Sequence, residues 1–117
     1  MEFHNLFLIL NDQSKHLECE LKFLFWRFEK RAEIIIQILR VLSSAHGKNI
    51  LHRDIKAENI MIGRAGEAYL MDWGIAIDLN QSNGEGQLAG SPRYMSPEQA
   101  SSQKQGPETD WYSFGVI

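Results

Sequence analysis

The sequence has few residues that cross-link or anchor a chain. Its 117 residues include one cysteine, Cys19, so a disulfide within the chain is excluded. A lone cysteine also fits a reducing compartment, and we expect a cytoplasmic protein. The apolar run Leu6–Leu10 is too short to span a bilayer, so no membrane segment is expected. His4, His16 and His46 form no metal-ligand pattern with Cys19.

Basic residues are also not in excess. Twelve Lys and Arg stand against fifteen Asp and Glu, for a net charge of −3. No basic stripe is present, which argues against nucleic acid as a partner. An apolar fraction of 44% and a charged fraction of 23% are ordinary for a soluble globular protein, and the length allows one domain at most.

The most informative stretch runs from His52 to Asn59 and reads His-Arg-Asp-Ile-Lys-Ala-Glu-Asn. Thirteen residues after Asn59 comes Asp72, the first residue of Asp-Trp-Gly. Two short apolar runs, 60–62 and 68–71, separate these motifs, and a glycine-rich polar turn joins the runs. This pattern predicts a β-hairpin. A symmetric hairpin would place Asn59 and Asp72 side by side at its open end.

Side chains of this kind suit the handling of metal-bound phosphates. An amide oxygen of Asn59 and a carboxylate of Asp72 would form a hard oxygen site for Mg²⁺, with phosphate and water as the remaining ligands. Asp54 and Lys56 lie just upstream. There a carboxylate can accept a hydroxyl proton, and an ammonium can neutralise charge on a transferring phosphoryl group.

The rest of the chain gives a partial outline of elements. Residues 1–29 are the least readable; residues 5–10 predict a buried strand, residues 11–14 a turn, and the apolar stripe from Leu17 to Phe28 a packed helix face. Residues 30–46 predict a helix buried on most sides, with Gly47 as its C-terminal cap. Residues 109–117 open another helix, with Thr109 or Asp110 near the cap position.

From about Arg31 onward, these motifs in this order resemble the central part of a eukaryotic-like (Hanks-type) serine/threonine protein kinase. The resemblance implies an α+β, protein-kinase-like fold: a partial C-terminal lobe, mainly helical with short β-hairpins, and an N-terminal lobe that is largely missing. Residues 52–74 would hold the catalytic and metal loops, residues 75–98 the activation segment and residues 109–117 the start of the next helix.

The resemblance also implies the roles of the central residues. Asp54 matches the aspartate that orients the substrate hydroxyl and accepts its proton, and Lys56 matches the lysine that contacts the γ-phosphate. Asn59 and Asp72 match the two Mg²⁺ ligands, and Met61 matches the apolar floor under adenine. The implied activity is transfer of the ATP γ-phosphate to a protein serine or threonine.

Further positions match supporting roles in the family. Arg53 can hold a phosphorylated activation loop, and Ser91 matches the hydroxyl that helps set serine/threonine specificity. Ser96-Pro97-Glu98 resembles the motif that closes the activation segment, and Asp110 matches the aspartate that holds the catalytic-loop backbone. His52 is expected to be a packed core histidine. Trp73 and Gly74 are expected to complete the Asp-x-Gly motif that begins at Asp72.

The sequence also departs from the family. Trp73 replaces the usual phenylalanine, and Ser96 replaces the usual alanine; both variants favour a bacterial source. No glycine-rich phosphate loop and no Val-Ala-x-Lys strand precede His52. Two interpretations follow: an incomplete catalytic domain of a kinase, or an inactive remnant that acts as a non-enzymatic interaction module.

Overall fold

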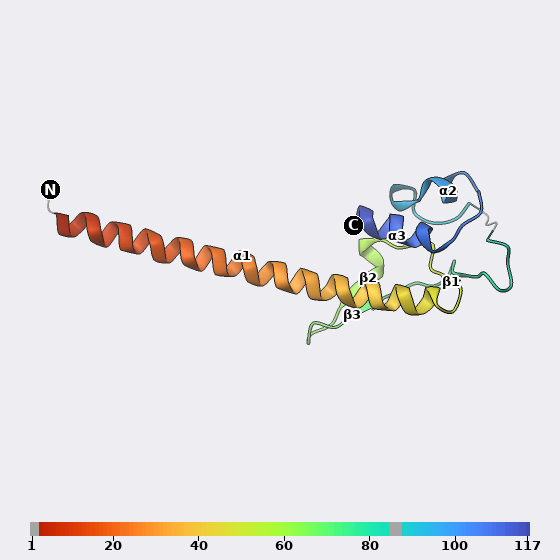
Figure 1. The fold of residues 1–117 in the computed structure, drawn as a ribbon, viewed down its shortest axis with the longest axis horizontal. Coiled ribbons are helices and arrows are strands. Elements are labelled where there is room, and N and C mark those ends of the chain that lie inside the picture. Colours follow the sequence, from red (N-terminus) through yellow and green to blue (C-terminus); the bar gives the residue numbers. More distant parts are fainter. Residues whose placement is uncertain (1–2, 85–87) are drawn as a thin grey trace. The chain divides into compact units, whose positions relative to one another are not determined.

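The computed structural model describes the backbone of residues 3–84 and 88–117, and the side chains of this range from residue 20 onward. The chain forms two compact units, residues 1–33 and residues 34–117. Figure 1 shows the elements, and each unit is described by itself. No helix in the described part is long and apolar enough to cross a membrane.

Helix α1 runs from Phe3 to His46 and is much longer than the predicted helix 30–46. The strand predicted at residues 5–10 and the turn at 11–14 are therefore wrong. A short apolar run cannot be assigned to strand or helix by periodicity alone, and leucine is a good helix former. The chain has no glycine and no proline before Gly47, so nothing in the sequence breaks the helix.

In the first unit, the described part of α1 carries an apolar stripe that is not buried. Leu21 is 64% exposed and Phe28 is 69% exposed, so the packing predicted for this stripe is wrong. The side chain of Leu17 lies outside the described residues. Local contacts among the remaining side chains are weak: Phe23 stacks on Trp26 with ring centroids 6.2 Å apart. Such exposure of large apolar side chains is unusual in a folded domain.

In the second unit, the C-terminal turns of α1 supply one wall of the core. Ile38 and Leu42 are fully buried against Ile55 and Leu70. Ile35 and Ile36, in contrast, are 46% and 47% exposed. The prediction of burial on most sides is wrong, because only one face of this helix meets the rest of the unit.

Helix α1 ends at His46, as predicted, but Gly47 is not its left-handed cap. The residue with positive φ is Asn49, at 61°. Gly47 N–H still donates to the carbonyl of Ser43 at 3.0 Å, which continues the helical pattern for one residue. Asparagine tolerates the left-handed conformation better than most residues, which explains the shift.

Two small antiparallel sheets flank the catalytic loop. Strand β1 (Ile50–Leu51) pairs with β4 (Ile77–Asp78), and β2 (Ile60–Ile62) pairs with β3 (Ala68–Leu70). The predicted hairpin is therefore confirmed. The Gln37 side chain ties it to α1, since it donates to the Gly66 carbonyl at 3.0 Å and accepts from the Ala68 amide at 2.8 Å.

After α1, the second unit holds three short helical elements and a longer helix. They are η1 (Ala57–Asn59), η2 (Pro92–Tyr94), α2 (Pro97–Ala100) and α3 (Pro107–Val116). The N-cap of α3 is Gly106, so the cap predicted at Thr109 or Asp110 is wrong. Proline at the first helical position favours this earlier start and moves Thr109 and Asp110 into the first turns, where both are buried.

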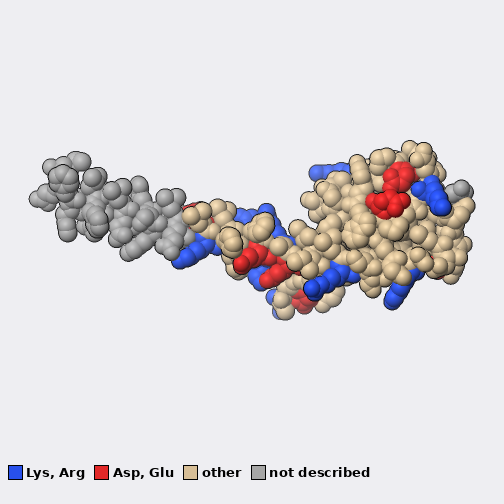
Figure 2. Space-filling view, viewed as in Figure 1, with Lys and Arg blue, Asp and Glu red and all other residues tan. Residues whose placement is uncertain are grey.

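On the face of the second unit drawn in Figure 2, lysine and arginine side chains are scattered singly between uncharged residues. Acidic side chains gather in one small group on that face. On this face the basic side chains are thus distributed, whereas the acidic ones are grouped.

Candidate active site

The catalytic loop begins on a buried anchor in α3. The Asp110 side chain, which is 0% exposed, accepts hydrogen bonds from the backbone N–H of His52 at 2.9 Å and of Arg53 at 2.8 Å. His46 Nε2 lies 2.8 Å from the same carboxylate. This is the contact that the resemblance implies for Asp110. It fixes Arg53 with φ at 68°, a conformation that a non-glycine residue adopts only when its surroundings enforce it.

Arg53 extends from this anchor toward the residues that follow Asp72. Its Nε donates to the Ile75 carbonyl at 2.8 Å, while one terminal nitrogen is buried without a partner among the described residues. Burial lowers the pKa of Arg53 and the nearby Asp110 raises it, with a net lowering. The guanidinium remains charged, because arginine does not lose its proton in proteins.

His52 connects the catalytic loop to the metal loop. Its Nδ1 accepts the Asp54 backbone N–H at 3.1 Å, and its Nε2 lies 2.8 Å from the Met71 carbonyl. These two partners require a neutral ring with the proton on Nε2. The Trp73 ring meets His52 edge-on, with centroids 4.5 Å apart. His52 is fully buried, and its prediction as a packed core histidine is confirmed.

Asp54, Lys56 and Ser91 form the centre of the site. The Ser91 hydroxyl donates to Asp54 Oδ1 at 2.9 Å and accepts from Lys56 Nζ at 2.8 Å. Lys56 Nζ lies 3.5 Å from Asp54 Oδ2. Both charged side chains remain partly exposed. Ser91, in the activation segment, thus places its hydroxyl between the carboxylate of Asp54 and the ammonium of Lys56. These two residues lie 37 and 35 positions earlier in the chain.

Asn59 completes this group from the end of η1. Its side-chain nitrogen donates to the Asp54 carbonyl at 2.8 Å and to Asp54 Oδ2 at 3.3 Å. Both bonds use the amide nitrogen and leave the amide oxygen for another ligand.

Asp72 lies one residue beyond the predicted register. The hairpin pairs Ile60 with Leu70, and the Met71 N–H donates to the Asn59 carbonyl at 2.7 Å, so Met71 and not Asp72 is opposite Asn59. Asp72 is exposed, with φ at 55°, and its Oδ1 accepts the Gly74 N–H at 3.3 Å. The prediction of side-by-side placement is wrong by one position, because the turn is centred on Ala65 rather than between Ala65 and Gly66.

The donor set of this region fits Mg²⁺. One exposed carboxylate and one free amide oxygen match a cation that takes few protein ligands and fills its shell with phosphate and water. In the described residues, no group of three or more His, Cys, Asp or Glu side chains could hold a metal by itself. Asn59 and Asp72 would therefore suit a metal ion that takes its remaining ligands from phosphate and water.

Two large apolar side chains near the two loops are exposed. Met61, the predicted adenine floor, lies on β2 and is 52% exposed. Trp73 is partly exposed, and its indole Nε1 donates to the Leu70 carbonyl at 3.0 Å.

The segment before Ser91 is fixed by residues that the sequence analysis missed. Gln99 Nε2 donates to the carbonyls of Arg53 and Ala89, both at 2.7 Å. Gly90 has φ at 115°, and a Cβ there would lie 2.7 Å from Gln99 Nε2 and 2.9 Å from the Arg53 carbonyl oxygen. The glycine before Ser91 was the one signal in the sequence for this close approach.

Glu98 closes the activation segment against α3. Its Oε1 accepts the Thr109 hydroxyl at 2.8 Å, and the Ser96 side chain caps α2 by accepting the Gln99 N–H at 3.3 Å. Burial raises the pKa of Glu98, but hydrogen bonds from Ser96, from the Glu98 backbone and from Thr109 together outweigh it, so that the pKa is lowered. The sequence did not predict the contact of Thr109 with Glu98 or that of His46 with Asp110.

Comparisons with known proteins identify the family of this chain. The family model of the protein kinase domain matches residues 4–117. The serine/threonine-protein kinase PknD of Protochlamydia amoebophila is 38% identical over 103 residues, 72% of this chain and 10% of that protein. The probable serine/threonine-protein kinase mkcD of Dictyostelium discoideum is 35% identical over 116 residues, 99% of this chain and 17% of that protein.

A third relative, the serine/threonine-protein kinase STE20 of Eremothecium gossypii, is 34% identical over 87 residues, 74% of this chain and 9% of that protein. The chain therefore spans less than a fifth of the length of these relatives. It carries a small mixed fold of helices and antiparallel hairpins that represents part of a kinase domain. This chain belongs to the protein kinase family, as a serine/threonine-type member with an incomplete catalytic domain.

Proposed function

We propose that this site, within a complete domain, transfers the γ-phosphoryl group of ATP to a serine or threonine of a protein substrate in the cytoplasm. The observation that best supports this proposal is that the Ser91 hydroxyl is hydrogen-bonded to both Asp54 and Lys56. A hydroxyl is the group that such a substrate would present. The position next to Asp54 and Lys56 therefore already accommodates an alcohol between a proton acceptor and a positive charge.

Each residue has a defined part in this proposal. Asp54 orients the substrate hydroxyl and takes its proton, while Lys56 balances the charge on the transferring group. Asn59 and Asp72 hold Mg²⁺, which supplies charge neutralisation on the ATP phosphates when bound. Met61 provides an apolar surface for the adenine ring. His52 and Asp110 keep the loop in the conformation that brings these groups together.

The alternative is an inactive remnant that acts as an interaction module. It is favoured by one observation: the Asp72 carboxylate is exposed and bonded only to the backbone of its own loop among the described residues. Positioning and electrostatics supply nearly all of phosphoryl-transfer catalysis. We therefore expect the 117-residue polypeptide by itself, which has no glycine-rich loop and no Val-Ala-x-Lys strand, to show no turnover of protein substrate with Mg-ATP.

A chimera separates the two functions. Residues 34–117 would replace the corresponding segment in the kinase domain of PknD, which supplies the remaining parts of a domain. We expect transfer of radiolabelled phosphate to a generic basic protein, with at least a 100-fold loss in the Asp54→Asn variant of the chimera. A folded chimera without Asp54-dependent transfer would overturn the proposal and favour the interaction module. Arg64→Gln, in the exposed hairpin turn, is the control with no expected loss.

A further inference from the structure

One polar side chain of α1 is bonded to the hairpin of β2 and β3. Gln37 Nε2 donates to the Gly66 carbonyl at 3.0 Å, and Gln37 Oε1 accepts the Ala68 N–H at 2.8 Å. The Gln37 side chain is half-buried, and its partners lie 29 and 31 residues later in the chain. Neither partner is a proposed catalytic residue. The contact therefore acts on the site only through the strand that it holds.

Gln37 pairs with the edge of β3 that faces away from β2. The Met71 N–H donates to the Asn59 carbonyl at 2.7 Å, so the alternate residues of this segment bond to the β2 side. The Ala68 N–H and the Gly66 carbonyl point the other way. A primary amide that accepts from one residue and donates to the residue two positions earlier reproduces the bonding of a neighbouring parallel strand. Gln37 thus takes the place of a third strand at one position.

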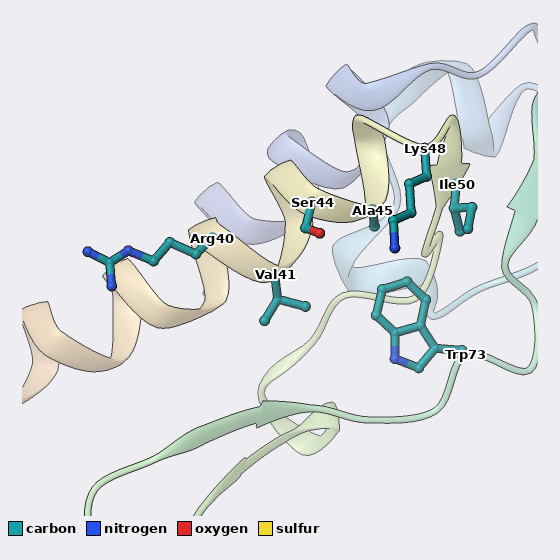
Figure 3. Close-up of a pocket in the computed structure, with 7 residues that line it drawn as sticks. All are labelled: Arg40, Val41, Ser44, Ala45, Lys48, Ile50 and Trp73. Atoms are coloured by element: carbon teal, nitrogen blue, oxygen red, sulfur yellow. The ribbon is translucent and has the colours of Figure 1, made fainter.

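Apolar packing brings the same side of the hairpin against α1. Ile38 is fully buried in the core, and Val41 and Ala68 pack against that core. Figure 3, drawn around a pocket beside this contact, shows Val41 pointing from α1 toward the strand that leads to Trp73. Apolar contacts are not directional and allow small sliding movements, whereas hydrogen bonds restrict both distance and angle. The two bonds of Gln37 therefore fix the position of β3 along α1.

Strand β3 leads directly to Asp72, one of the two proposed metal ligands. The strand ends at Leu70, two residues before Asp72. Met71, between them, is bonded to the catalytic loop, because its carbonyl lies 2.8 Å from His52 Nε2. The His52 contact holds one end of the segment from β3 to Asp72, and Gln37 holds the other end. Both ends have to be fixed to set the direction in which the chain reaches Asp72.

The other proposed metal ligand, Asn59, is held from a different side. Its side-chain nitrogen donates to the Asp54 carbonyl at 2.8 Å and to Asp54 Oδ2 at 3.3 Å. The Asn59 side chain thus follows the catalytic loop, whereas Asp72 follows β3. A shift of β3 along α1 therefore changes the separation of the two ligands and leaves Asp54 in place.

We propose that Gln37 is a positioning residue for the metal site, because its side-chain amide sets the place of Asp72 relative to Asn59. The inference rests on the proposed phosphoryl transfer, since that activity needs the two ligands together. A misplacement of about 1 Å can lower a rate by about 100-fold. For a pair of metal ligands, the same misplacement weakens the hold on Mg²⁺, so a Gln37 variant should need more Mg²⁺ for the same rate.

Amide hydrogen exchange of the full 117-residue chain, without metal or nucleotide, is the first test. Gln37→Met keeps nearly the same length but has neither the donor nor the acceptor. We expect exchange to accelerate at least about tenfold at Ala68, which loses its acceptor, and about threefold at Met71, where the loosened strand weakens the bond to Asn59. Gln103→Met, the same change at an exposed glutamine, is the control and should leave both rates unchanged.

The chimera with PknD gives a second readout. Rates of phosphate transfer are measured at increasing free Mg²⁺ with saturating ATP. In Gln37→Met, the Mg²⁺ concentration for half-maximal rate should rise about fivefold, while the KM for the protein substrate stays within about twofold. A purely structural role would lower the folded fraction and the maximal rate but leave both constants unchanged, because each folded molecule would be normal. Gln37→Glu, which cannot donate to Gly66 when ionised, should change the Mg²⁺ requirement in the same direction and replaces Gln37→Met if that variant does not fold.

Three results would overturn the inference: unchanged exchange at Met71, a lower maximal rate with both constants unchanged, or equal effects in Gln103→Met. A parent chimera without Asp54-dependent transfer overturns the proposed function and this inference with it. Asp54-dependent transfer with an unaltered Mg²⁺ requirement in the folded Gln37 variants overturns this inference alone.

Discussion

The catalytic loop and the metal loop carry equally important residues but are held in different ways. His52, Arg53 and Asn59 are buried. Three residues outside the loop form hydrogen bonds with it: Asp110 of α3, Gln99 of α2, and Met71 through its carbonyl. Asp72 and Gly74 are exposed and bonded mainly to each other. The loop that carries the proposed base Asp54 is therefore held by contacts within this chain, whereas the loop of the proposed metal ligand Asp72 has few such contacts among the described residues.

The largest effect should come from removing the anchor of the catalytic loop. Asp110→Ala leaves the buried N–H groups of His52 and Arg53 without acceptors, at a cost of about 3 kcal/mol in stability. Amide hydrogen exchange at these two residues should accelerate about 100-fold. Asp72→Ala is the control, because its exposed carboxylate should change the free energy of unfolding by less than about 0.5 kcal/mol. Equal effects of the two substitutions would contradict the difference between the loops.

A smaller effect should follow from crowding the catalytic loop where the activation segment crosses it. Gly90→Ala places a methyl group against Gln99 and the Arg53 carbonyl, and alanine also avoids the positive φ of this position. The free energy of unfolding should fall by about 2 kcal/mol. Gly66→Ala shares the positive φ but meets no atom within 4 Å, so about 1 kcal/mol is expected there. Urea unfolding followed by tryptophan fluorescence compares the two. A larger loss at Gly66 would show that the close approach at Gly90 is not tight.

The smallest effect should be a pH dependence from Glu98. Because the pKa of Glu98 is lowered in the folded chain, its contribution to stability is complete above the unfolded value of about 4.5 and is lost as the pH falls through the lower folded value. Thr109→Val removes one of the hydrogen bonds to the carboxylate and should reduce this acid-dependent loss. Urea midpoints at pH 7 and pH 3 measure both chains. If the urea midpoint shifts by the same amount between pH 7 and pH 3 in the parent and in Thr109→Val, Thr109 does not contribute to the pH dependence.

The sequence predicted the local features of the second unit well. Two apolar runs around a glycine-rich turn were sufficient for the hairpin of β2 and β3, and the spacing of the motifs was sufficient for the family. The predicted register was wrong by one residue, since the turn is centred on Ala65 and not between Ala65 and Gly66. That single position decides whether Met71 or Asp72 is opposite Asn59.

What the sequence did not predict involves long separations or missing neighbours. Gln99 and Arg53 are 46 residues apart, and His46 and Asp110 are 64 apart, so no local pattern signals their contacts. The burial of α1 was overestimated because an apolar helix pattern says which side chains could be covered, not whether anything covers them. The helical start at Phe3 was missed although the absence of glycine and proline favoured it.

The dependence of the catalytic loop on Asp110 also sets an order of events during synthesis. His52 leaves the ribosome 58 residues before its acceptor, which at about 5–20 residues per second is an interval of several seconds. During that time the two amides and the left-handed Arg53 have no anchor, and the loop samples other conformations. The anchored conformation of the loop therefore forms late, only after α3 has been translated, and a nascent chain arrested before residue 110 should expose this segment to proteases and chaperones.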